Sequence, residues 1–366
     1  MWLGILSGLY GVPALLGLLL SIWRALSALR QRRFLRALGW LSGAALILTG
    51  REWIRLLRPP APDEPKPLVP NRRGTAIGHG GVLLEWEQFG PDDAPALLLS
   101  HGWSLSHETW YYQKKALSRE FRVLVWDLRG TGRSQAPADR DYSMTAMTAD
   151  LAAVFDASDA GRHPNGCVLA GHSVGAMLLP LFAASYPAQM ARVRGIALLG
   201  GTDSPMLETM RGRRILAPLR VPFWEPLARL MAFAPGPFEG FVKLITQLGC
   251  VHLALMFGTN SGQDSRGQND LVARHCAEFS MRAAGLGALS CFAYEAHALL
   301  PHVTVPTLVL TGLKDNNMPP ETQRAMASRL PACELVLIEN CGHLGLLECH
   351  TEVNAYLQNF ARRCLK

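Results

Sequence analysis

The chain has 366 residues, of which 49% are hydrophobic, so it can form one large domain or two smaller ones with a substantial core. Its formal net charge of +7 is unevenly distributed: residues 1–73 contain 11 Lys and Arg against 3 Asp and Glu, and the remainder contains 25 against 26. A basic excess confined to the N-terminal region argues against a nucleic-acid partner and favours a membrane surface.

The N-terminal residues 2–23 carry no charge. As a helix this run would be about 33 Å long, enough to cross the roughly 30 Å hydrocarbon core of a bilayer. Trp2 and Trp23 at its ends are typical of interfacial anchors. A cleaved signal peptide is disfavoured because no Lys or Arg precedes the run.

An arginine-rich stretch and a second apolar run follow. The second run, Ala37–Gly50, is bounded by Arg36 and Arg51. It is short for a span, so it either crosses the membrane with snorkelling arginines or lies in the interface. We prefer a hairpin, which would place the body of the protein outside the cytoplasm, whereas a single span would leave it inside. Residues 1–58 are thus expected to anchor the protein in the cell membrane.

A proline-rich segment separates this anchor from the body of the protein. Residues 59–70 contain six prolines, which exclude a helix and favour a semi-rigid extended spacer. We therefore expect a linker over residues 59–74.

From about residue 75 short apolar strands alternate with helices. We expect strands at 82–89, 96–100, 121–126, 167–170, 193–199, 307–310 and 334–338, and helices at 107–117, 144–155, 176–186, 321–330 and 352–362. This alternation indicates an α/β fold with a mostly parallel sheet covered on both faces, and it places reactive groups at the carboxyl ends of the strands. Residues 202–302 lack it and are rich in Met, Phe and Leu, so they predict a helical cap inserted between core segments 75–201 and 303–366.

The segment Gly171-His172-Ser173-Val174-Gly175 lies between an expected strand and an expected helix. It matches Gly-x-Ser-x-Gly, in which the serine occupies a strained turn and the two glycines allow close backbone packing. Alone the pentapeptide could arise by chance, but its strand and helix context makes Ser173 the candidate nucleophile.

A serine hydroxyl needs a base, and the base needs a carboxylate to orient it. Asp315 follows the expected strand at 307–310, and His343 follows the one at 334–338. The order Ser173, Asp315, His343 is that of an α/β-hydrolase triad. Asp203 is the alternative acid, although a turn at the entry to the cap is the preferred interpretation.

The tetrahedral intermediate of such a reaction needs two backbone N–H donors. Val174 follows the nucleophile and would supply one, and Trp103 in His101-Gly102-Trp103 would supply the other. His101 is expected to be a structural hydrogen-bonding residue. The glycine-rich loop 127–134 lacks the lysine and the helix of a phosphate cradle, so a structural turn is preferred.

Residues from about 75 to 362 resemble the α/β-hydrolase superfamily, in the branch of serine esterases and monoacylglycerol-lipase-like enzymes. The segments that carry the resemblance are His101–Trp103, Asp127–Ser134, Gly171–Gly175, Asp315 and Asn340–His343. The resemblance implies an eight-stranded, mostly parallel sheet and hydrolysis through an acyl-enzyme without a cofactor.

Some residues set this chain apart from parts of that superfamily. Related epoxide hydrolases and haloalkane dehalogenases have an aspartate nucleophile, so Ser173 disfavours their reactions. Many relatives have Gly at the position of Ala176, and Pro180 lies inside the helix after the serine.

An apolar cap next to a membrane anchor indicates a hydrophobic small-molecule or lipid ester as substrate. Thioesters and lactones fit the same chemistry, and the same triad would serve an acyltransferase or a cofactor-free peroxidase. A non-catalytic scaffold would have lost a triad residue, and none is missing. Eight cysteines without a Cys-x-x-Cys pair predict no metal site, although their even number permits disulfides.

Overall fold

The computed structural model describes the fold of residues 2–366 and the side chains from Ser7 onward, so the side chain of Trp2, one expected anchor, lies outside the described residues. The core is an eight-stranded sheet in the order β1-β2-β4-β3-β5-β6-β7-β8. β2 pairs antiparallel with β1 and β4, and all other neighbours are parallel. The strands are β1 (Arg72–Ile77), β2 (Leu83–Phe89), β3 (Ala96–Ser100), β4 (Arg122–Trp126), β5 (Cys167–His172), β6 (Val193–Leu199), β7 (Thr307–Gly312) and β8 (Cys333–Ile338).

Seven of these strands lie where the apolar runs predict them, but the edge strand β1 was not expected. It begins at Arg72, inside the segment assigned to the linker. Only Ala76 of β1 is buried, so the strand has no apolar alternation that the sequence could reveal. Its backbone pairing with β2 holds it in place.

The sheet is covered on both faces, because successive residues of its strands face opposite ways. In β3, Leu97 and Leu99 join one apolar core and Leu98 joins the other. The first core includes side chains of α4 (Tyr111–Leu117), α16 (Gly345–Glu348) and α17 (His350–Cys364). The second includes side chains of α5 (Met144–Ala157), α6 (Val174–Ser185) and α15 (Pro320–Ala327).

The insertion between β6 and β7 is helical. Its main elements are α8 (Met206–Thr209), α9 (Arg213–Leu216), η3 (Arg220–Trp224), α10 (Glu225–Phe233), α11 (Pro235–Gln247), α12 (Cys250–Ala254), η4 (Leu255–Thr259), α13 (Arg266–Glu278) and α14 (Met281–Phe292). Short turns of helix complete the fold: η1 (His79–Gly81), η2 (His107–Trp110), α7 (Pro187–Met190) and η5 (Leu300–His302).

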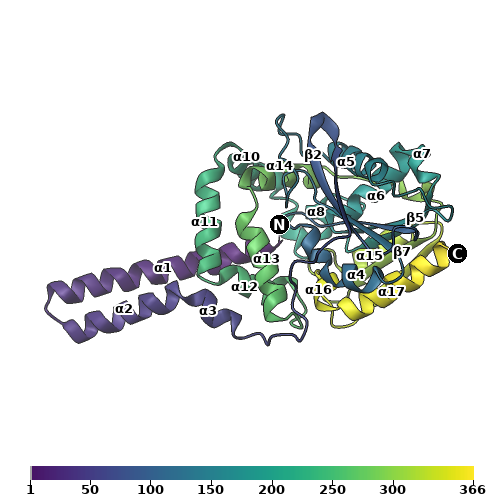
Figure 1. Cartoon of the computed structure of the whole chain (residues 1–366). Helices are drawn as coiled ribbons and strands as arrows, with labels where there is room; N and C mark the ends of the chain where they lie inside the picture. Colours follow the sequence, from purple (N-terminus) through teal and green to yellow (C-terminus); the bar gives the residue numbers. More distant parts are fainter. Residues whose placement is uncertain (1) are drawn as a thin grey trace.

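The N-terminal region forms two antiparallel helices that project from the body (Figure 1). α1 (Trp2–Arg30) and α2 (Phe34–Leu48) are followed by the short α3 (Gly50–Arg55). Among the described residues, one helix is long and apolar enough to cross a membrane, namely α1 over Ser7–Arg30. A second segment, α11 followed by α12 and η4, is also long and apolar enough, but it is bent by 78°. The base of the hairpin packs on the cap: a Cβ at Gly11 would lie 2.6 Å from Ile245 Cγ2.

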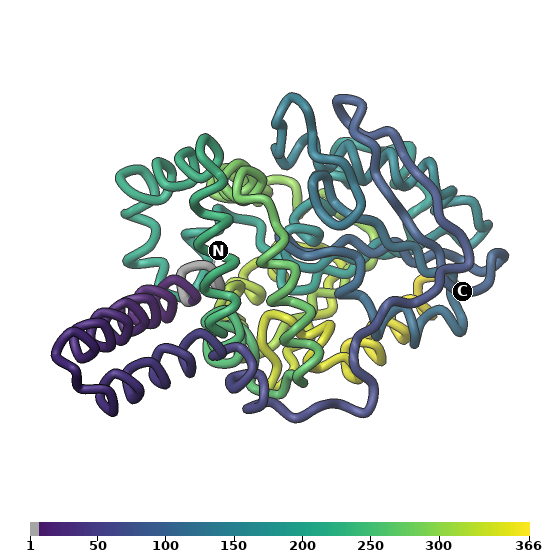
Figure 2. Tube along the Cα trace, turned by 60° about the vertical axis from the view of Figure 1, so that its left-hand side comes forward, coloured from purple at the N-terminus to yellow at the C-terminus, as the bar shows by residue number. Residues whose placement is uncertain are grey.

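The proline-rich linker is extended, and it is attached to the body rather than free (Figure 2). Asp63 accepts hydrogen bonds from the Tyr111 hydroxyl at 2.7 Å and from Lys115 Nζ at 2.7 Å. The next residue of the linker, Glu64, accepts a hydrogen bond through Oε2 from Ser265 Oγ of the cap at 2.5 Å. The linker therefore crosses from the cap to α4 and joins the two.

Candidate active site

Ser173 lies on the turn between β5 and α6 with φ 53° and ψ −119°. A left-handed φ is unfavourable for a residue with a side chain and costs about 1–3 kcal/mol, which the surrounding structure must supply. The N–H of Ser173 donates to Leu199 O at 2.8 Å and ties the turn to β6. The side chain is 8% exposed.

The two glycines of the motif are required by close backbone packing. A Cβ at Gly175 would lie 2.3 Å from Ser100 O, and a Cβ at Gly171 would lie 2.3 Å from Gly175 O. Both distances are shorter than any real contact, so the predicted reason for these glycines agrees with the structure.

Asp315 and His343 meet at the carboxyl edge of the sheet. The distance from His343 Nδ1 to Asp315 Oδ2 is 2.8 Å, and both residues are buried. The other carboxylate oxygen accepts the backbone N–H groups of Asn317 and Met318, each at 2.8 Å. The carboxylate therefore has a fixed orientation, and it favours the imidazole tautomer with the proton on Nδ1 and a lone pair on Nε2.

The loop that carries His343 is held against the serine turn and the cap. His172 Nε2 lies 2.9 Å from His343 O, and the two imidazole rings are 4.9 Å apart. The N–H of His343 donates to Thr259 O at 3.0 Å. Neither contact could be predicted from the sequence, because His172 occupies a variable position of Gly-x-Ser-x-Gly and Thr259 lies in a cap that has no recognisable motif.

Ser173 is close to this pair but is not hydrogen-bonded to it. Across the described residues, its hydroxyl has no side-chain hydrogen bond. The Ser173 N–H donates to the carbonyl oxygen of Leu199, and the next residue, Gly200, lies against the pair. A Cβ at Gly200 would lie 3.3 Å from Asp315 Oδ2 and 3.4 Å from His343 Cε1.

The two residues expected to supply oxyanion donors belong to segments that adjoin Ser173. Val174 is the first residue of α6. A Cβ at Gly102 would lie 3.2 Å from Ser173 Cβ, which places the loop of Trp103 beside Ser173. The Trp103 ring packs edge-on against Tyr142 and Phe279, with centroid distances of 5.9 and 5.3 Å.

The remaining polar candidates have structural partners. His101 Nε2 accepts the Leu128 N–H at 3.0 Å, and burial lowers the pKa of its imidazole to about 4, in keeping with the expected structural role. Asp203 binds His297 Nδ1 at 3.0 Å and Arg329 Nη1 at 2.9 Å. The structure thus gives Asp203 partners other than His343.

Glu348 fixes the loop that carries His343. Its Oε1 accepts the Gly342 N–H at 2.9 Å, and its Oε2 accepts both the N–H and the hydroxyl of Ser261 at 2.6 Å. Burial raises the pKa of this carboxyl to about 7. The cap segment with Ser261 is therefore joined to the loop of His343 through one carboxyl group.

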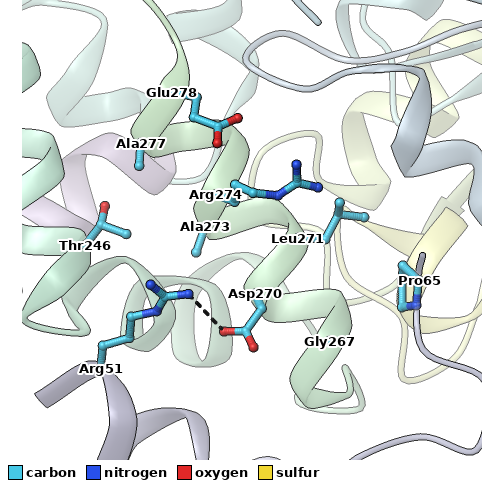
Figure 3. Close-up of a pocket in the computed structure, with 10 residues that line it drawn as sticks. All are labelled: Arg51, Pro65, Thr246, Gly267, Asp270, Leu271, Ala273, Arg274, Ala277 and Glu278. Carbon is cyan, nitrogen blue, oxygen red and sulfur yellow. Dashed lines mark ion pairs between the residues drawn. The ribbon is translucent and has the colours of Figure 1, made fainter. Parts of the chain in front are cut away.

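Two cavities lie outside this cluster. The larger, about 570 Å³, is lined by residues of α3, the linker, α11 and α13, and Arg51 points toward Asp270 across it at 4.0 Å (Figure 3). The second, about 330 Å³, is lined by the glycine-rich loop and α4. Ser173 lines neither of them.

Within the described part of the chain, no group of three or more His, Cys, Asp or Glu side chains is arranged to hold a metal ion. All eight cysteines, which lie in that part, are free.

Comparison with known proteins gives a consistent family assignment. Bifunctional epoxide hydrolase 2 of Mus musculus is 26% identical over 326 residues, which cover 81% of this chain and 57% of that protein. A thermophilic esterase from Thermogutta terrifontis is 26% identical with a TM-score of 0.58, and the match covers 81% of this chain and 100% of that one. A bacterial membrane phospholipase A is 21% identical with a TM-score of 0.63, and it covers 96% of this chain and 98% of its own.

Residues 97–356 match the alpha/beta hydrolase family, and that range includes the serine turn, the whole cap and the aspartate–histidine pair. The chain belongs to the alpha/beta hydrolase family and is an esterase-like hydrolase.

Proposed function

We propose that this hydrolase is a membrane-anchored serine esterase that cleaves a hydrophobic carboxylic ester through an acyl-enzyme. The observation that carries the proposal is the 2.8 Å contact between His343 Nδ1 and Asp315 Oδ2, in a loop bonded to the residue before Ser173. A base fixed in this tautomer beside a strained serine is what nucleophilic acyl transfer requires.

In the proposed mechanism, Ser173 Oγ attacks the ester carbonyl carbon while His343 Nε2 takes the hydroxyl proton. The resulting oxyanion accepts hydrogen bonds from the N–H groups of Val174 and Trp103. The tetrahedral intermediate expels the alcohol, which takes the proton from His343. Water then attacks the acyl-enzyme, with His343 as base, and the carboxylic acid leaves as Ser173 regains its proton.

The reaction is tested with a fluorophosphonate probe on the full-length protein. Wild type is expected to become covalently labelled, and Ser173→Ala is expected to lose labelling. Ser185→Ala, which replaces an exposed serine at the last position of α6, is the control and should label as wild type does. Undiminished labelling of Ser173→Ala would exclude Ser173 as the nucleophile.

Hydrophobic substrates are supported by the position and composition of the cap. It exposes large apolar side chains, among them Ile215, Val221, Phe223, Phe233 and Phe257. Lipid and other long-chain esters are the substrates that such a surface favours. Hydrolysis rates for an ester series of increasing acyl length test this, and a steady fall beyond short acetyl or butyryl esters would contradict it.

The membrane anchor is proposed to be the α1–α2 hairpin. Its outer surface is apolar, with Leu16, Leu19, Leu38 and Leu41 exposed, and its arginine-rich tip lies at the far end from the body (Figure 1). At 1.5 Å per residue, α2 would be about 22 Å long, short enough to need local thinning or snorkelling arginines.

A hairpin that crosses the bilayer would place its tip and the catalytic body on opposite sides. The positive-inside rule then puts the tip in the cytoplasm and the body outside it. The membrane phospholipase A, whose match extends over 96% of this chain, adds support for an anchored form. An alkaline phosphatase fused after Lys366 should be active, and a fluorescent protein there should be dark; the reverse result would place the body inside.

Acyl transfer to an alcohol, thioester cleavage and cofactor-free peroxidation use the same residues. Product analysis with glycerol present as a competing acceptor distinguishes transfer from hydrolysis. Acid as the main product is the outcome that the esterase proposal predicts.

A further inference from the structure

The cavity of about 330 Å³ lies between the glycine-rich loop, α4 and cap helix α13. Gly130, Thr131, Gly132 and Arg133 of that loop line it. The sequence offered no phosphate role for the loop because no lysine belongs to it. The fold supplies one from elsewhere, since Lys114 of α4 lines the same cavity.

The buried carboxylates of this cavity are already neutralised. Glu87 contacts Arg73 Nε at 3.0 Å and His107 Nε2 at 3.1 Å, and it also pairs with Arg133. Asp127 Oδ1 lies 3.0 Å from His107 Nδ1. Because His107 sits between these two carboxylates, the pKa of its imidazole is raised, so it contributes positive charge.

Glu108, which is partly buried at the same cavity, is also paired. Its Oε2 lies 2.6 Å from Arg274 Nη2 and 3.3 Å from His275 Nε2. Of the four carboxylates at the cavity, only Glu278 has no ion pair among the described residues, and it is exposed to solvent.

Lys114 is buried in the cavity and has no ion pair among the described residues, although the charges of Glu87, Glu108 and Asp127 act on it from farther away. The residue is 3% exposed, and its Nζ lies 5.1 Å from the centre of the Phe89 ring. Within the described residues, no carboxylate is within ion-pair distance of this ammonium and no acceptor is hydrogen-bonded to it. Burial lowers its pKa to about 8. An ammonium desolvated in this way is unfavourable unless an anion completes the site.

We propose that this cavity is a binding site for one phosphate or carboxylate group, held by Lys114 from below and by Arg133 at the rim. The side chain of Arg133 is 43% exposed, so it remains accessible from solvent. The cavity adjoins the loop of the proposed oxyanion hole: Ser104, next to Trp103, and Phe279, which packs on the Trp103 ring at 5.3 Å, both line it.

Two sources could supply this anionic group. It could be the charged part of an ester substrate whose acyl carbon reaches Ser173, or it could be a free anion such as inorganic phosphate. The site itself is independent of the proposed esterase function, because binding can be measured on protein without a nucleophile.

Isothermal titration of full-length Ser173→Ala protein in detergent with inorganic phosphate tests the site. Saturable binding is expected, and adding Lys114→Met should weaken it roughly ten- to hundredfold, because a charge-assisted hydrogen bond is lost. Lys115→Met is the matched control: this neighbour is exposed and pairs with Asp63 at 2.7 Å, so phosphate affinity should be unchanged.

Thermal unfolding gives a second measurement. Without phosphate, Lys114→Met should be at least as stable as the parent protein, because the unpaired buried charge is gone. The stabilisation that phosphate gives the parent should disappear in this variant. The proposal would be overturned if phosphate showed no saturable binding to the parent protein, or if Lys114→Met bound phosphate with equal affinity. If Lys114→Met does not fold, the titration of the parent protein alone still tests the site.

Kinetic measurements on proteins that retain Ser173 distinguish an anion that belongs to the substrate from a free anion. If the anion is part of the substrate, kcat/KM for a monoacylglycerol phosphate should exceed that for the monoacylglycerol of equal chain length, and Lys114→Met should remove the preference. If it is a free anion, phosphate should bind without competing with either ester. Failure of catalysis with phosphate binding intact would count against the esterase proposal alone.

Discussion

His343 Nδ1 lies 2.8 Å from Asp315 Oδ2, although 28 residues separate them in the chain. The pair is fixed at both ends: Asn317 and Met318 donate to the carboxylate, and the His343 N–H donates to Thr259 O of the cap. The imidazole is therefore oriented before any substrate arrives. Because one of its supports belongs to the cap, movement of the cap would also move this imidazole.

Replacing Asp315 with Asn should disable the base while preserving its position. The amide would donate to Nδ1 or leave it unprotonated, which puts the proton on Nε2, where the serine proton must go. A loss of about 10⁴-fold in kcat is expected, measured with p-nitrophenyl esters. Asp203→Asn is the control, because Asp203 binds Arg329 and His297. Retained activity in Asp315→Asn with loss in Asp203→Asn would reverse the assignment of the acid.

The backbone strain at Ser173 predicts an unusual order of stabilities. Ser173→Gly should be more stable than Ser173→Ala by about 1 kcal/mol, because glycine adopts a φ of 53° without a Cβ clash. Urea denaturation of the two inactive variants measures the difference. Equal stability, or a more stable alanine variant, would show that the turn relaxes when the hydroxyl is removed.

Gly175→Ala should disrupt the serine turn. The new Cβ would lie 2.3 Å from Ser100 O, so β3 and α6 must separate, and a loss of about 3 kcal/mol or more in unfolding free energy is expected. Gly240→Ala in α11 is the control, since nothing lies within 4 Å of its new Cβ. There alanine should stabilise the helix by about 0.5–1 kcal/mol. A mild effect at Gly175 would mean that the turn can move.

The raised pKa of Glu348 predicts that the free energy of unfolding decreases as pH rises. Burial raises its folded pKa to about 7 from a model value of 4.5, so the folded state keeps a proton that the unfolded state loses between these values. Its contribution is fully present below the lower value and is lost as pH rises through the upper one. Urea unfolding at pH 5 and pH 8 should show a smaller decrease for Glu348→Gln than for wild type. Glu352→Gln, at an exposed position of α17, should behave as wild type.

The hairpin and the cap should be coupled through Gly11. A valine there would overlap Ile245 of α11, because even a single Cβ would lie 2.6 Å from Ile245 Cγ2. Gly11→Val should increase deuterium uptake in α11, measured by hydrogen exchange of the detergent-solubilised protein. Gly8→Val is the matched control on the same helix, since nothing lies within 4 Å of its Cβ. Equal uptake in both variants would indicate that the hairpin does not restrain the cap.

Similarity to an epoxide hydrolase does not by itself identify the reaction of this chain. The mouse protein is 26% identical to this chain, yet the candidate nucleophile of this chain is Ser173, whereas epoxide hydrolases of the superfamily that it resembles carry an aspartate. A carboxylate and a hydroxyl make different covalent intermediates, so the serine and its base are the better guide to the reaction.

The sequence alone determined the features that depend on neighbours in the chain. Apolar runs marked seven strands, and glycines on both sides of Ser173 marked its turn, because steric demands within a few residues follow directly from residue type. The sequence also predicts a triad of Ser173, Asp315 and His343 and a helical cap, and these stay predictions.

Only the tertiary structure decided which distant groups meet. It placed His343 beside Asp315, paired Asp203 with Arg329 and bound the linker to Tyr111. It also placed Lys114 in a cavity without an ion pair among the described residues. These contacts depend on the strand order β6-β7-β8 and on how the cap packs. Strand order and packing arise from interactions between segments far apart in the chain, and no local pattern of residues encodes them.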